Sequence, residues 1–401
     1  MNRIYLKRGK EESLLRRHPW VFSGAIHHTD TGLDDGQTVQ VFDSNGQYMA
    51  TGHYQQSSIA VRILTFSDET IDTGFWQRRL QAAYTLRQTV GLLSRPDTNA
   101  YRLVHGEGDL LPGLVIDIYG HTAVMQAHST GMHLARRQIA AALQQVMDGQ
   151  IDSIYYKSET TLPYMAQTGE AENGFLVGGC ADDVAMENGL RFHVDWLRGQ
   201  KTGFFVDQRD NRALLERYAK GRRVLNMFCY TGGFSFYAMR GGASVVHSVD
   251  SSAKAIELTR SNVELNFPDD QRHQAYCEDA FRFLEHVRRP DSPDHGQGYD
   301  LVILDPPAFA KHRGALHNAL KGYIRLNAEA LSQMEPGSLL FTFSCSQVVT
   351  KDHFRAALFT AAAQAGREVS VLHQLHQPAD HPVNIYHPEG EYLKGLVLYV
   401  E

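Results

Sequence analysis

The stretch from Val224 to Asp250 constrains the fold more than any other part of the chain. It contains a short apolar run, a turn at Gly232 and Gly233, a helical pattern over 234–240, and a second apolar run that stops at Asp250. Two adjacent glycines can adopt backbone angles closed to other residues and leave room for a ligand against the main chain. A carboxylate at the end of the second strand can accept hydrogen bonds from a ribose diol. The stretch predicts the nucleoside-binding half of a doubly wound sheet, and the alternative is an ordinary βαβ unit with a surface aspartate.

Length and composition narrow the classes of protein further. With 401 residues, of which 43% are hydrophobic, the chain is long enough for two or three domains with cores of their own. It contains no window of eighteen apolar residues, and its first residues lack the hydrophobic core of a signal peptide. We therefore expect a soluble, cytoplasmic protein with no membrane partner.

The four cysteines, Cys180, Cys229, Cys277 and Cys345, are scattered without CxxC spacing. This distribution argues against a zinc site and against a disulfide framework, so we expect no metal. Any chemistry at a cysteine would be that of a thiol.

Residues 1–70 are expected to form a small β-rich domain. Short runs with strand character are separated by the turn sequences DDG and SNG, as in a compact barrel or sandwich. Although the net charge of the chain is −6, residues 1–20 carry six Lys or Arg against two Glu. This basic segment is either a solvated face or an edge that contacts phosphates beside Trp20 and Phe22.

Residues 71–190 are expected to form an α+β domain, with helical patterns after Thr70 and over 133–147. The sequence GEGD and the Asn-Gly pairs at Asn173 and Asn188 indicate hairpin turns. From 191 to 401 strands and helices alternate, which predicts an α/β domain with a parallel sheet. Its first helix begins with Asp207, Gln208, Arg209 and Asp210, and the helix dipole alone can explain the acidic residues there.

Two polar residues are predicted at the ends of neighbouring strands. Leu301–Leu304 reads as a buried strand that Asp305 and Pro306 end abruptly, because proline cannot continue a ladder. Cys345 follows the strand SLLFTFS after one crossover helix. Parallel strands joined in this way point in the same direction, so both side chains should open on one crevice. There Asp305 could bind an amino group or a protonated ring nitrogen of a base, whereas Cys345 is either reactive or an inert packing residue.

Several motifs together resemble the bacterial ribosomal RNA large subunit methyltransferase I family. They are KTGFFVDQR, NMFCYTGG, Asp250, Asp279, DPPAF, FSCS and HPEGEYLKGL, and HPWVFSGAI resembles the PUA domain of that family. The resemblance covers nearly the whole chain. It implies a PUA-like domain (1–70), an RNA-facing α+β middle domain (71–190) and a Rossmann-like class I methyltransferase domain (191–401). It also implies S-adenosylmethionine (SAM) as cofactor and a cytosine of 23S ribosomal RNA as substrate, with no DNA partner.

The resemblance assigns expected roles to individual residues. Cys345 would add to position 6 of cytosine, because carbon 5 is a poor nucleophile until a thiolate has added. Asp305 would assist at the base. The cofactor contacts are expected at Gly232, Gly233, Asp250 (ribose), Asp279 (adenine), Pro306 and, on the methionine side, Phe205, Asp207, Gln208 and Arg209. Cytosine-5 enzymes of the Nop2/Sun type carry another cysteine where this chain has DPPAF, so the general base stays unassigned.

Two other functions fit parts of the same sequence. A DPP followed by an aromatic residue, here Phe309, also resembles SAM-dependent enzymes that methylate exocyclic amines without a thiol. A non-catalytic RNA-binding protein would use only the N-terminal domain and a relict nucleoside fold. A dehydrogenase fits less well, because TGGFS departs from GxGxxG.

Overall fold

The computed structural model describes the chain except for residues 164–172, 180–183, 292, 294–295 and 311, so Cys180 lies outside the described part. The chain forms two compact units. The first contains residues 1–187, 194–206 and 379–390, and the second contains 188–193, 207–378 and 391–401. The C-terminal third of the chain therefore sends residues 379–390, here named the returning segment, back to the first unit.

The first sheet of the first unit has six strands in the order β2-β6-β5-β4-β1-β3. Its elements are β1 (Asn2–Leu6), α1 (Glu12–Leu15), β2 (Trp20–Phe22), β3 (Ile26–Thr29), β4 (Thr38–Phe42), β5 (Tyr48–Tyr54) and β6 (Ile59–Thr65). Along β4 the apolar residues Val39 and Val41 are fully buried and alternate with partly exposed neighbours. Such alternation is typical of a sheet with one face on a core.

The second sheet of this unit has five strands in the order β11-β10-β9-β8-β7. Its elements are α2 (Thr73–Thr89), β7 (Ala100–His105), β8 (Leu114–Tyr119), β9 (Thr122–Ala127), α3 (Thr130–Val146), β10 (Ser153–Tyr156) and β11 (Gly174–Val177). Helix α2 begins where the Asp72 side chain accepts a hydrogen bond from the Phe75 N–H. GEGD lies in the β7–β8 connection, as the hairpin prediction requires, but forms the 3₁₀ helix η2 (Gly106–Asp109) and no tight turn. Two short strands, β12 (Val184–Glu187) and β13 (Leu190–His193), flank Asn188 and Gly189, which both have positive φ.

The second unit is built on a seven-stranded sheet in the order β16-β15-β14-β17-β18-β20-β19. The strands are β14 (Arg223–Met227), β15 (Val245–Asp250), β16 (His273–Cys277), β17 (Leu301–Leu304), β18 (Ser338–Ser344), β19 (Val369–His376) and β20 (Lys394–Val400). The first five are parallel, whereas β20 runs antiparallel to both β18 and β19. This order confirms the predicted α/β Rossmann-like class.

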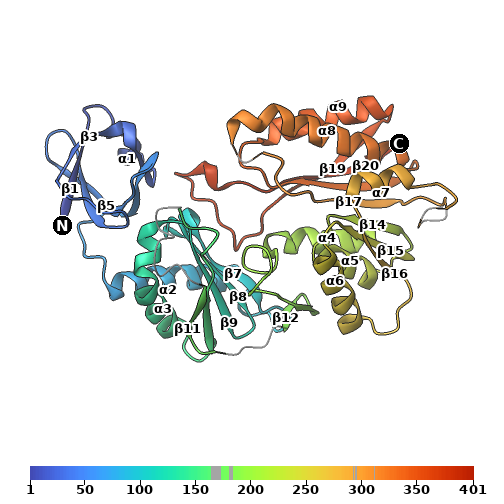
Figure 1. The fold of residues 1–401 in the computed structure, drawn as a ribbon, viewed down its shortest axis with the longest axis horizontal. Coiled ribbons are helices and arrows are strands. Elements are labelled where there is room, and N and C mark those ends of the chain that lie inside the picture. Colours follow the sequence, from blue (N-terminus) through green and yellow to red (C-terminus); the bar gives the residue numbers. More distant parts are fainter. Residues whose placement is uncertain (164–172, 180–183, 292, 294–295, 311) are drawn as a thin grey trace. The chain divides into compact units, whose positions relative to one another are not determined.

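Helices cover both faces of this sheet, α4, α5 and α6 on one and α7, α8 and α9 on the other (Figure 1). They are α4 (Arg209–Tyr218), α5 (Gly233–Arg240), α6 (Ala253–Asn266), α7 (Ala280–His286), α8 (Leu316–Gln333) and α9 (Lys351–Ala365). Because both faces are covered, β17 and β18 are buried along their whole length. In the described part of the chain, no helix is long and apolar enough to span a membrane.

The topological switch point of the sheet lies between β14 and β17. The chain proceeds from β14 outward to β15 and β16, and then returns to place β17 on the other side of β14. Loops that leave neighbouring strands in opposite directions open a crevice at their carboxyl ends, where α/β sheets bind ligands. The glycine turn follows β14, and Asp305 follows β17.

Candidate active site

The turn after β14 is held in a conformation that requires glycine. Phe228, Tyr230 and Gly232 all have positive φ, with values of 58°, 49° and 84°. A Cβ on Gly232 would lie 2.5 Å from Cζ of Phe236 and 2.8 Å from Cγ2 of Thr259. Any larger residue at this position would push α5 away from the strand that it follows. The prediction that the glycine pair makes this turn is confirmed for Gly232.

Asp250 holds the same turn from the next strand. Its Oδ2 accepts a hydrogen bond from the Tyr230 N–H at 3.0 Å, and its Oδ1 accepts one from the Ser252 N–H at 2.9 Å. A carboxylate has about four acceptor positions, so these two bonds orient the group and leave capacity for further donors.

Asp279 stands at the end of the neighbouring strand and begins α7. The backbone N–H groups of Phe281 and Arg282 donate to its Oδ1 at 3.0 and 3.1 Å. Its Oδ2 has no hydrogen-bond partner among the described residues, and the side chain is exposed. Strand β16 pairs with β15, and the Glu278 N–H donates to the Asp250 carbonyl at 3.0 Å. The two aspartates predicted as cofactor ligands therefore stand at adjacent strand ends.

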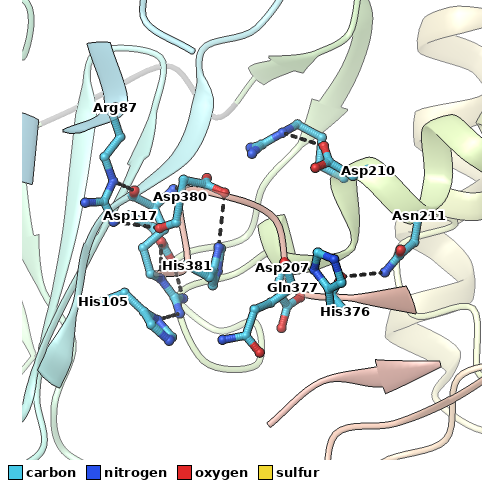
Figure 2. Close-up of polar contacts among 12 residues, drawn as sticks. Arg87, His105, Asp117, Asp207, Asp210, Asn211, His376, Gln377, Asp380 and His381 are labelled. Atoms are coloured by element: carbon cyan, nitrogen blue, oxygen red, sulfur yellow. Dashed lines mark hydrogen bonds and ion pairs between the residues drawn. The ribbon is translucent and has the colours of Figure 1, made fainter. Parts of the chain in front are cut away.

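The start of α4 forms a buried polar cluster with the loop after β17. Gln208 donates through Nε2 to Oδ2 of Asp305 at 3.0 Å, and its Oε1 accepts from Nδ2 of Asn211 at 2.6 Å. The Tyr392 hydroxyl donates to Oδ2 of Asp207 at 2.5 Å. Figure 2 shows Asn211 reaching the backbone carbonyl of His376, at 3.4 Å. Three of the four residues that the resemblance assigned to the methionine side, Asp207, Gln208 and Arg209, are buried here.

Two other predicted cofactor contacts are placed differently. Phe205 belongs to the segment that folds with the first unit, where Nζ of Lys201 lies 5.3 Å from its ring centroid. The polar cluster at α4 belongs to the second unit, so the role of Phe205 stays a prediction. Pro306 is buried directly after Asp305, at the carboxyl end of β17.

Asp305 and Cys345 follow two adjacent parallel strands, as predicted. In the ladder of β17 and β18, Leu304 is opposite Thr342. The loops that follow are tied together, because the Ser346 hydroxyl donates to the Ala310 carbonyl at 2.6 Å. Cys345 is partly exposed between these loops.

Lys394 is a neighbour of Cys345 that the sequence predictions missed. It is opposite Ser344 in the β18–β20 ladder and is only 5% exposed. Its Nζ donates to the carbonyls of Ser346 at 2.5 Å and Val349 at 2.6 Å. Burial lowers its pKa from 10.5 to about 8; negative charge at Cys345 or at Glu391 opposes that shift, and the charge of Lys351 adds to it. Among the described residues, no carboxylate lies within ion-pair distance of this ammonium.

A buried tyrosine packs against the DPPAF motif. Tyr323 is fully buried on α8, and its ring centroid lies 4.6 Å from that of Phe309 in the DPPAF motif. Burial raises its pKa to about 12. The phenol therefore stays neutral at physiological pH.

The other described cysteines have different surroundings. Cys229 is buried in the glycine turn, where burial first and the Asp250 carboxylate second raise the pKa of its thiol. Cys277 is exposed at the end of β16, and its thiol lies 3.6 Å from the Ser251 carbonyl. Cys345 is the described cysteine that has a buried cation beside it.

Comparison with known proteins assigns the chain to a family. A model for S-adenosylmethionine-dependent methyltransferases matches residues 172–388, and a model for PUA-like domains matches residues 4–66. The ribosomal RNA large subunit methyltransferase I of Tolumonas auensis is 43% identical over 98% of both chains. The protein of the same name from Erwinia tasmaniensis is 40% identical over 99% of both. The chain belongs to the ribosomal RNA large subunit methyltransferase I family.

A solved structure matches the chain over its entire length. The crystal structure described as a putative methyltransferase complexed with SAH has a TM-score of 0.84 and 25% identity, and covers 99% of this chain and 100% of its own. The predicted cofactor and the predicted family are thereby confirmed: members of the methyltransferase I family use SAM. The domain boundaries at 70 and 190, and the residue roles within the crevice, stay predictions.

Proposed function

We propose that this chain transfers a methyl group from SAM to carbon 5 of a cytosine in 23S ribosomal RNA, through a covalent adduct between Cys345 and the base. The name shared by its relatives, ribosomal RNA large subunit methyltransferase I, supports the choice of RNA. The choice of carbon 5 depends on the thiol.

The observation that carries the proposal is the buried Lys394 ammonium beside Cys345. Burial removes the hydration of the lysine ammonium. Without a carboxylate partner, the two carbonyl acceptors replace that hydration only in part. A thiolate at Cys345 would supply the missing negative charge. Methylation of an exocyclic amine needs no thiolate, so this arrangement favours carbon-5 chemistry over the N-methyltransferase alternative.

The chemistry then assigns a task to each side chain. The Cys345 thiolate adds to carbon 6 of the cytosine, and the electron pair of the 5,6 double bond becomes available at carbon 5. Asp305 stabilises positive charge on the base nitrogen during addition, because its carboxylate is oriented by Gln208. After methylation, loss of the carbon-5 proton returns an electron pair to the ring and expels the thiolate.

The residues at the strand ends fit SAM. When bound, SAM supplies an electrophilic methyl group. Asp250 retains acceptor capacity beyond its two backbone bonds, as ribose hydroxyls require, and the available Oδ2 of Asp279 suits an adenine amine. Gly232 keeps the turn free of side-chain atoms.

A suicide substrate tests the thiol. RNA that contains 5-fluorocytosine should form a covalent adduct with the enzyme in the presence of SAM, because fluorine cannot leave as a proton after methylation. We expect the adduct to survive denaturing electrophoresis and to map to Cys345 by peptide mass spectrometry. Cys345→Ala should abolish both adduct and turnover.

Two cysteine variants are matched controls. Cys277→Ala removes an exposed thiol and should leave adduct formation unchanged, whereas Cys229→Ala should affect only packing or cofactor affinity. Robust methylation of RNA by Cys345→Ala would reject the thiolate mechanism and favour the N-methyltransferase. Absence of SAM binding in calorimetry would favour the non-catalytic RNA-binding protein.

A further inference from the structure

The first unit contains a cavity of about 360 Å³ that none of the assignments above uses. Five parts of the chain line it: the residues after α1, the end of β6 with the residues that follow, α2, η2 with the residue after it, and the returning segment. Its notable side chains are Arg17, Phe66, Arg79, Leu110 and Tyr386. This combination of cationic and aromatic groups is suited to a ligand that has both a negative charge and a flat apolar face.

Two arginines of the cavity, Arg17 and Arg79, form no ion pair with a described residue. The Arg17 side chain is exposed, has no hydrogen bond or ion pair with a described residue, and lies 4.8 Å over the Phe66 ring. Its φ of 62° is unusual for a residue other than glycine. Among the described residues, the Arg79 side chain donates only to the Leu64 carbonyl, at 3.3 Å.

The nearest carboxylate is already engaged. Glu69 accepts from Arg78 at 2.5 Å and from the Thr65 hydroxyl at 2.7 Å. Burial lowers the pKa of Arg79, Glu69 opposes this shift, and the charges of Arg78 and Arg17 add to it. Arg79 therefore has two cationic neighbours and a carboxylate neighbour that is already paired, and an anion in the cavity would relieve the repulsion.

The opposite wall is apolar and partly exposed. Tyr386 is 46% exposed and Leu110 is 41% exposed. The backbone at Tyr386 is held in place, because its N–H donates to the Asn384 side chain at 2.9 Å, and Asn384 donates to the Glu107 carbonyl at 3.3 Å. The partly exposed aromatic face that this backbone carries is available to a flat ligand.

The returning segment is anchored at both ends. Asp380 accepts from the Arg102 N–H at 3.0 Å, and its carbonyl accepts from Arg87 at 2.6 Å, close to the buried His381 (Figure 2). At the other end, the ring of His387 lies 4.3 Å from that of Trp20. The wall that carries Tyr386 is therefore preformed.

Gly108 allows the returning segment to lie close against η2. A Cβ at that position would lie 2.0 Å from the Pro382 carbonyl oxygen. The GEGD segment, η2, thus packs against the returning segment, a role that its sequence did not indicate.

We propose that this cavity binds one unpaired nucleotide of the RNA substrate, with its phosphate at Arg17 and Arg79 and its base against Tyr386. The inference rests on the proposed RNA substrate and adds a second point of recognition to it. Proteins that bind single strands combine a cationic path for the backbone with aromatic platforms for bases.

The size of the cavity decides between forms of RNA. A volume of about 360 Å³ is at the lower end for small-ligand pockets and accommodates one nucleotide, whereas a base-paired helix would have to remain outside. An acidic peptide would satisfy the arginines but leave the exposed face of Tyr386 unused.

Binding measurements on the full-length protein with SAM present test the charge. The probe is a fluorescent single-stranded RNA of about twelve nucleotides that lacks cytosine, so that no adduct with Cys345 contributes. Arg17→Gln should weaken binding about tenfold and lower the slope of log K against log salt by about 0.7, which is one phosphate contact.

Arg16→Gln is the matched control. Arg16 is exposed next to Arg17 but is paired with Glu12 and does not line the cavity. It should change affinity and salt slope little. If both variants weaken RNA binding equally, the effect is that of general surface charge and the proposal is overturned.

Tyr386 tests the stacking. Tyr386→Ala should weaken binding of the single strand about tenfold, whereas Tyr386→Phe should retain it, because the aromatic face is preserved. RNA with 4-thiouridine should crosslink to the peptide that contains Tyr386. Binding of an RNA duplex with the same dependence on Tyr386, or equal competition by polyglutamate, would reject the unpaired nucleotide.

The outcomes separate this inference from the proposed reaction. If the 5-fluorocytosine adduct forms at Cys345 but the cavity variants bind RNA like wild type, the cavity proposal fails and the reaction stands. If no adduct forms and the variants lose RNA affinity, the cavity stands without the reaction.

Discussion

Replacing Lys394 by methionine is the sharpest test of the thiolate. Methionine matches the length of the lysine stem but removes the charge. Without the ammonium, the fraction of Cys345 present as thiolate at pH 7 should fall by about tenfold or more, because a neighbouring cation is a principal cause of thiolate formation. Alkylation of Cys345 by iodoacetamide should slow by the same factor.

The effect of this change on stability should be small at pH 7. The depression of the Lys394 pKa from 10.5 to about 8 corresponds to about 3 kcal/mol, which solvent screening reduces to on the order of 2 kcal/mol. Removing the ammonium recovers that energy but leaves the carbonyls of Ser346 and Val349 without their donor, which costs about 1–3 kcal/mol. The two terms oppose each other.

The stability difference between wild type and Lys394→Met should change with pH in a direction that a change in packing alone would not produce. Because the folded pKa lies below the unfolded one, the unfolded chain binds more protons between pH 8 and 10.5. The destabilisation from the buried charge is complete below pH 8 and is lost above 10.5. Wild type should therefore gain on the order of 2 kcal/mol relative to Lys394→Met across this interval, measured by urea unfolding.

The assay has internal and external controls. Cys277 reports alkylation at an exposed thiol in the same molecule, and Lys351→Met removes a surface lysine that is paired with Glu391. Turnover of Lys394→Met should fall at pH 7 and recover partly at higher pH, where the thiol ionises without help. Unchanged alkylation of Cys345 in this variant would refute the reasoning, whatever happens to turnover.

Three other predictions concern the crevice. Asp250→Ala should weaken SAM binding in calorimetry, with two hydrogen bonds of about 1.5–3 kcal/mol each at stake, and unchanged affinity would count against the ribose assignment. Gly232→Val should lower the melting temperature and SAM affinity together, because its Cβ would overlap Phe236; a normal melting temperature would contradict that overlap. Asp305→Asn should reduce kcat by more than it reduces RNA affinity, and an equal loss in both would assign Asp305 to binding alone.

The sequence predicted the elements whose information is local. Strand, glycine turn, helix and terminal carboxylate lie within the 27 residues from Val224 to Asp250, and their order alone places Gly232 and Asp250 together. The same holds for Asp305 and Cys345, because one right-handed crossover fixes the direction of both strands. Local periodicity and a chirality rule are sufficient for these residues.

The rest of the site depends on contacts that no local pattern encodes. Lys394 meets the loop after Cys345 only because β20 runs antiparallel to β18, a pairing across about fifty residues. One signal was present: a lysine begins the apolar strand KGLVLYV, where a buried cation needs a reason. The returning segment gives no comparable signal, because its anchors at Arg102 and Gly108 lie more than 270 residues earlier.

The contrast between two cysteines shows what the fold contributes to reactivity. Cys229 and Cys345 both follow the carboxyl ends of central parallel strands, β14 and β18, so strand position alone does not distinguish them. Cys229 is buried beside the Asp250 carboxylate, and both influences favour its neutral thiol. Cys345 is partly exposed and has the Lys394 ammonium across the ladder, which favours the anion. Because β20 pairs antiparallel with β18, the Lys394 ammonium lies at the Cys345 strand end and not at the Cys229 strand end. This placement, more than the thiol itself, would confine nucleophilic chemistry to the base side of the crevice.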